Sequence, residues 1–65
     1  MFKVTFLKFF HSGSLKGLSF NETVTFPTLE TAIDYSKFLL DHTVNPVATL
    51  EGTNYTAHCI EIKTE

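Results

Sequence analysis

Two segments near the start of the chain alternate between apolar and polar side chains. Residues 2–10 read FKVTFLKFF, and residues two apart share a face of a strand, so this segment predicts a strand. Residues 18–26 alternate in the same way, with Glu22 in the apolar row, a position typical of a bulge or an edge. The loop at 11–17, rich in Ser and Gly, predicts an antiparallel hairpin. The apolar face of the first strand comprises Phe2, Val4, Phe6 and Phe10.

The spacing after this hairpin predicts one helix over about 29–42. Pro27 ends the second strand, and Thr28 suits the N-cap because its hydroxyl can accept a hydrogen bond from a free backbone amide. Glu30 lies in the first turn, where the helix dipole favours an acid. At about 100° per residue, one face of the helix is apolar and the opposite face is charged. The residues expected on the sheet are Leu29, Ala32, Ile33, Ser36, Leu39 and Leu40.

The last third of the chain predicts a second hairpin. The Asn-Pro pair at 45–46 breaks the helix, and residues 47–51 and 55–62 form strands around a turn that contains Gly. The prediction is one α+β domain over 1–65, a β-β-α-β-β two-layer sandwich with a four-stranded antiparallel sheet and one helix on one face. The faces of the closing strand stay open: one holds Tyr55, Ala57 and Cys59, and the other Thr56, His58, Ile60 and Ile62.

Two groups of apolar side chains have no predicted cover within the chain. Leu7 and Phe9 lie on the sheet face away from the helix, and Tyr35, Phe38 and His42 form a stripe on the side of the helix. A helix about 10 Å wide cannot cover four strands that span about 19 Å. Covering about 300 Å² of apolar surface is worth roughly 7 kcal/mol before the costs of association. We therefore expect a homodimer formed through the open face or the helix stripe; the alternative is a monomer in which Phe9 folds over a sheet edge.

The composition narrows the class of protein. With 43% apolar residues, the chain has the profile of a folded globular protein. Its single cysteine, Cys59, cannot form a disulfide within the chain, so we expect a reducing compartment, the cytoplasm. The first residues lack a small-residue cleavage site, and no apolar stretch reaches the roughly 20 residues that span a bilayer. Neither an export signal nor a membrane partner is expected.

Charge is unevenly distributed along the chain. Residues 1–20 hold three lysines and no acid, whereas residues 21–65 hold seven acids and two lysines, so the two parts carry +3 and −5 and the total is −2. Such a pattern fits a basic strand beside acidic elements of the same chain, with an acidic partner as the alternative.

Single-stranded nucleic acid is the second functional hypothesis. Aromatic side chains beside lysines on an open sheet face can stack bases, and Phe9, Tyr55, Lys3 and Lys8 are the candidates. Five lysines, no arginine and a negative net charge disfavour this hypothesis, because phosphate neutralisation would be weak.

No residue pattern predicts catalysis, a metal or a cofactor. His11, His42, His58 and Cys59 lack the spacing of metal ligands, and Cys59 is expected to be a buried, inert thiol. The loop at 11–17 has amides, hydroxyls and a lysine that could hold an anion, which the sequence leaves open. In general style the chain resembles compact accessory proteins of phages and bacteria, although no motif carries that resemblance. We expect a non-catalytic interaction or structural module.

Overall fold

The computed structural model describes residues 1–64 and confirms the predicted fold class and the order of its elements. The helix ends one residue earlier than predicted, and the last strand is longer at both ends. The helix has 13 residues, and within the described range no helix is long and apolar enough to cross a membrane. The elements are β1 (Phe2–Phe10), β2 (Ser19–Phe26), α1 (Leu29–Asp41), β3 (Val47–Ala48) and β4 (Asn54–Thr64).

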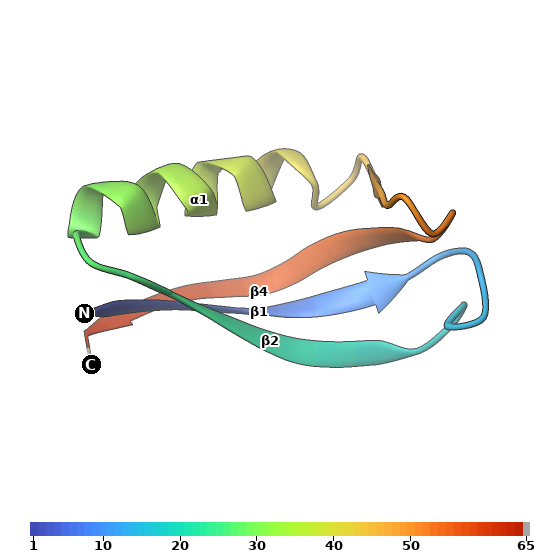
Figure 1. Cartoon of the computed structure of the whole chain (residues 1–65), viewed down its shortest axis with the longest axis horizontal. Coiled ribbons are helices and arrows are strands. Elements are labelled where there is room, and N and C mark those ends of the chain that lie inside the picture. The colour runs from blue at the N-terminus through green and yellow to red at the C-terminus, as the bar shows by residue number, and fades with distance from the viewer. Residues whose placement is uncertain (65) are drawn as a thin grey trace.

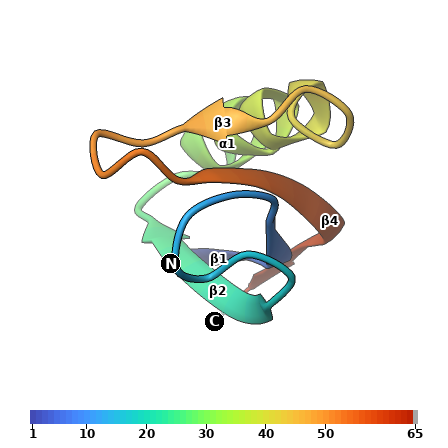
Figure 2. The same ribbon diagram turned by 90° about the vertical axis from the view of Figure 1, so that its right-hand side faces the viewer.

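The four strands form a curled antiparallel sheet in the order β2-β1-β4-β3, with α1 on one face (Figures 1 and 2). In β1, Phe2 lies opposite Phe26 of β2 and opposite Thr64 of β4. Since α1 follows almost directly from Phe26, its first turn lies at the end of the sheet where β4 finishes. The other end of α1 is tied to the start of β4, where the Ala57 amide donates to the His42 carbonyl at 2.9 Å.

The start of α1 follows the predicted capping pattern. Thr28 has extended backbone angles, and its hydroxyl accepts a hydrogen bond from the Thr31 amide at 3.2 Å. This bond satisfies one of the amides that the first turn leaves free, and it sets the residue at which the helix begins.

A bulge in β4 decides which residues of the closing strand face the helix. The register between β1 and β4 shifts between Thr5 and Leu7, so Phe6 lies opposite two residues, Cys59 and Ile60. Cys59 has φ of 54°, in the left-handed region that favours glycine. One extra residue exchanges the two faces of the strand beyond it, so each of the two alternative sets is correct only in part. The residues of β4 on the helix side are Tyr55, Ala57, Ile60 and Ile62.

The core lies between α1 and the sheet, but the predicted helix face needs a correction. Ala32, Ser36 and Leu39 are buried as expected. Leu29, Ile33 and Leu40, predicted to lie on the sheet, are 47%, 38% and 59% exposed. The helix is turned so that Tyr35 packs on the sheet instead, against the rings of Phe6 in β1 and Phe26 in β2. The buried apolar core comprises Val4, Phe6, Phe10, Ala32, Leu39 and Ala57.

β3 is shorter than predicted and leaves one edge of the sheet open. The prediction placed a strand over 47–51, but Thr49 already begins a turn in which its amide donates to the Thr53 carbonyl at 2.9 Å. β3 pairs only with Asn54 and Tyr55 of β4. Among residues 1–64, no strand pairs with the outer edge of β4 over 58–64. The part of α1 above this edge therefore has no strand beneath it.

Candidate interaction surfaces

The stripe of Tyr35, Phe38 and His42 on α1 is a continuous row of rings. Tyr35 and Phe38 stack with centroids 5.9 Å apart, and Phe38 meets His42 edge-on at 4.6 Å. The His42 Nδ1 lies 2.7 Å from the Asn45 carbonyl oxygen, so Nδ1 carries the proton and donates. Tyr35 and His42 are half-buried and Phe38 is 42% exposed, so the stripe presents mainly one ring to a partner.

Tyr35 joins this stripe to the core. Its ring lies edge-on to Phe6 at 6.2 Å and tilted against Phe26 at 5.2 Å. Burial raises the pKa of the Tyr35 hydroxyl above its ordinary value, and the negative charges of ionised Tyr55 and of Glu22 raise it further. The hydroxyl is therefore neutral at physiological pH.

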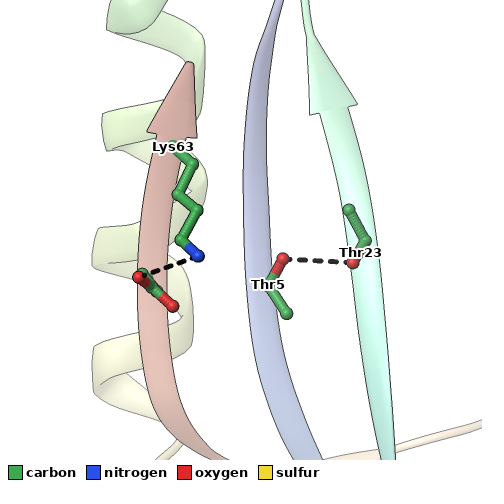
Figure 3. A network of polar contacts seen from close by, with 4 residues as sticks. Thr5, Thr23 and Lys63 are labelled. Atoms are coloured by element: carbon green, nitrogen blue, oxygen red, sulfur yellow. Dashed lines mark hydrogen bonds and ion pairs between the residues drawn. The ribbon is translucent and has the colours of Figure 1, made fainter. Parts of the chain in front are cut away.

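The sheet face away from α1 is less apolar than the sequence predicts. Leu7 and Phe9 lie on it as expected, but both are half-buried, and the ring of Phe9 meets His11 edge-on at 4.9 Å. The other end of this face is polar, since the Thr5 and Thr23 hydroxyls lie 3.1 Å apart (Figure 3). This face offers a small apolar area within a polar surround.

Two histidines share one threonine hydroxyl on the same face. The Thr56 Oγ1 lies 2.8 Å from His11 Nε2 and 2.7 Å from His58 Nε2. A hydroxyl has one proton, so with neutral rings it donates to one imidazole and accepts from the other. Thr56 is buried, so its hydroxyl is shielded from any substrate. The arrangement fixes loop 11–17 against β4.

The other groups considered from the sequence lie apart. Within the part of the chain that the structure describes, no three side chains of the His, Cys, Asp or Glu type come together as metal ligands. Cys59 is exposed on the bulge, which corrects the expectation of a buried thiol. In loop 11–17, the amides of Lys16 and Gly17 donate to the carbonyls of Gly13 and Phe10, so they are unavailable to an anion.

The residues proposed for base stacking lie on two different faces. Phe9 is on the open face, whereas Tyr55 lies on the helix side beside Phe10, with ring centroids 5.9 Å apart. Lys8 also lies on the helix side, 4.4 Å from the centroid of the Tyr55 ring, and its Nζ pairs with Glu22 at 2.9 Å. This pair also accounts for Glu22 within the apolar row of β2. The charge of Lys8 is thus already balanced within the chain.

The largest exposed apolar surface of the helix lies on the flank opposite the aromatic stripe. Leu29, Ile33 and Leu40, here called the leucine flank, occupy one side of α1 at helical spacing. Tyr35, on the other side of α1, packs on Phe6 of β1 and Phe26 of β2, so the leucine flank faces away from β2, toward the outer edge of β4. The sequence predicted these residues to lie in the core. Helical periodicity identifies the apolar side of a helix, but it does not show how much of that side the sheet covers.

Comparisons with protein-family models, with curated proteins and with solved structures found no match to this chain.

Proposed function

We propose that this protein is a non-catalytic interaction module that self-associates through the leucine flank and the adjoining edge of β4. One observation carries the proposal: an exposed apolar flank lies beside a strand edge that is open over 58–64. An open edge presents unpaired amides and carbonyls that readily accept another strand, and an apolar patch beside it favours association. We place this module in a reducing compartment, the cytoplasm, because its one thiol, Cys59, is free and exposed.

The energies favour the use of both features together. Fully burying a Leu or Ile side chain is worth about 1.5–3 kcal/mol, so covering the exposed half of all three flank residues gives at most roughly 3 kcal/mol per copy. Two copies gain at most about 6 kcal/mol, which lies at the low end of the estimated 4–15 kcal/mol cost of association. Apolar contact alone therefore gives a weak complex. Hydrogen bonds between strand edges would add the remaining stabilisation and fix the orientation.

The surroundings of the polar side chains support a non-catalytic role. The hydroxyl between the two histidines is buried, and the paired carboxylates of α1, Glu30 and Asp34, lie on its exposed face.

The test compares two substitutions of one kind. Leu29→Glu places a charge on the leucine flank in the first turn of α1, where the helix dipole tolerates an acid. Leu50→Glu makes the same change at a fully exposed residue in the β3–β4 turn and serves as the matched control. In sedimentation equilibrium, the native chain and Leu50→Glu are expected to dimerise and Leu29→Glu to be monomeric, with unchanged circular dichroism. A native chain that stays monomeric at millimolar concentration, or a dimer unaffected by Leu29→Glu, would contradict the proposal.

A further inference from the structure

We infer that the occupant of the open edge is β4 of a second copy, paired antiparallel about a two-fold axis at Ile62. This inference rests on the proposed self-association and specifies its register. Its basis is the self-complementary charge pattern Glu61-Ile62-Lys63 at the open edge. A two-fold axis at the central residue places Glu61 of each copy opposite Lys63 of the other.

The register follows from the faces of β4. Directly opposed residues of an antiparallel pair share one face of the sheet, so apolar must meet apolar and polar must meet polar. An axis at Ile62 satisfies this rule, because Ile62 meets its own copy on the helix side while Glu61 and Lys63 meet on the other side. An axis at Glu61 would oppose two acids, and an axis at Lys63 would oppose two lysines, which is destabilising. An axis at Ile60 would place the bulge at Cys59 inside the new ladder.

The two charges are available for this exchange. Within one chain, Lys63 Nζ lies 3.4 Å from Glu61 Oε1 (Figure 3), and the two side chains are 63% and 57% exposed. An exposed pair of this kind contributes little by itself. Pairing with a second copy keeps each charge beside an opposite one and adds a cross-strand contact on both sides of the axis.

The apolar surface near the axis matches the same arrangement. The first turn of α1 lies at the end of the sheet where β4 finishes, so Leu29 and Ile33 are the members of the leucine flank closest to residues 60–64. The two-fold axis brings these side chains of both helices together on one face of a continuous sheet, above Ile60 and Ile62 of each copy. Leu40, near the His42 end of the helix, lies beyond this contact.

The charges provide the test. Glu61→Lys alone opposes lysines across the axis and Lys63→Glu alone opposes acids, so each variant is expected to dimerise about tenfold more weakly than the native chain. An equimolar mixture of the two variants restores opposite charges in both pairs, and is expected to form a heterodimer of native affinity. The double variant Glu61→Lys/Lys63→Glu retains the pattern and is the matched control. Analytical ultracentrifugation with one variant labelled measures each affinity, and circular dichroism verifies that each variant is folded.

The outcomes separate this inference from the proposed function. A dimer that both single variants leave unchanged, or single variants whose mixture is no tighter than either alone, overturns the register while leaving self-association in place. Loss of the dimer on Leu40→Glu would also overturn it, because Leu40 lies outside the predicted contact. A native chain that does not associate removes the proposed function and this inference together.

Discussion

Phe6 and Phe38 are the same residue type in opposite situations, and the structure predicts very different costs for truncating each. The Phe6 side chain is 1% exposed, at the centre of the core and against the bulge. Phe6→Ala removes a buried ring at a cost of about 3–5 kcal/mol. A core of this size seldom supplies more than about 3–5 kcal/mol in total. Phe6→Ala is therefore expected to leave most of the protein unfolded at 25 °C.

Phe38→Ala should be far milder. Phe38 is 42% exposed and rests on Tyr35 and His42 at the surface. Full burial of such a side chain is worth about 1.5–3 kcal/mol, so losing roughly half of it costs about 1 kcal/mol. With a urea dependence near 1 kcal/mol per molar, the midpoint of unfolding falls by about 1 M.

The assay is urea unfolding followed by far-ultraviolet circular dichroism and by tyrosine fluorescence, at a concentration below the onset of association. The chain has no Trp, so Tyr35 and Tyr55 report directly on the core. Equal destabilisation by the two substitutions would refute the reasoning, because it would place Phe38 inside the core and the face of α1 elsewhere.

Three further predictions concern single positions. Cys59→Gly is expected to raise the free energy of unfolding by about 0.5–1 kcal/mol, since glycine accepts the left-handed backbone without strain, and Cys59→Val is expected to lower it by at least as much. Calorimetry measures both changes, and a destabilising glycine would argue against the bulge. Gly13→Ala should lower the free energy of unfolding by about 1 kcal/mol more than Gly17→Ala, as measured by chemical unfolding. Both glycines have positive φ, but only at Gly13 would a new Cβ collide with the Thr53 methyl group, and equal losses would contradict that contact. The pKa of Tyr35 is raised in the folded state, so the stability contributed by its neutral hydroxyl is fully present below pH 10 and is lost as pH rises through the folded pKa. Tyr35→Phe should remove this loss at alkaline pH, which is measured as the melting temperature against pH. An unchanged profile in the variant would contradict the prediction.

The sequence predicted the elements whose patterns are local. β1, β2 and α1 follow from alternation and capping within single segments, and Thr28 caps the helix as expected. The aromatic stripe on α1 was also predictable, because rings three and four residues apart on a helix lie together.

What the sequence could not predict depends on long-range geometry. The bulge at Cys59 is set by the register between β1 and β4, and nothing local distinguishes Cys59 from an ordinary strand residue. The exposure of Leu40 depends on how α1 lies over the sheet, which local periodicity does not reveal, and within residues 1–64 α1 contacts β1, β2 and β4 but not β3. The pairing of Lys8 with Glu22 likewise follows from the register between β1 and β2.

The hydrogen bond from the Ala57 amide to the His42 carbonyl has a consequence for any strand that approaches β4. Together with β3, the bond closes the first part of the outer edge, so an incoming strand meets an obstruction before it reaches Tyr55. The remaining free length is short and lies wholly beyond Ala57. In the proposed dimer, an incoming strand is therefore confined to the part of β4 beyond Ala57, and a strand that continued toward Tyr55 would have to displace the end of α1.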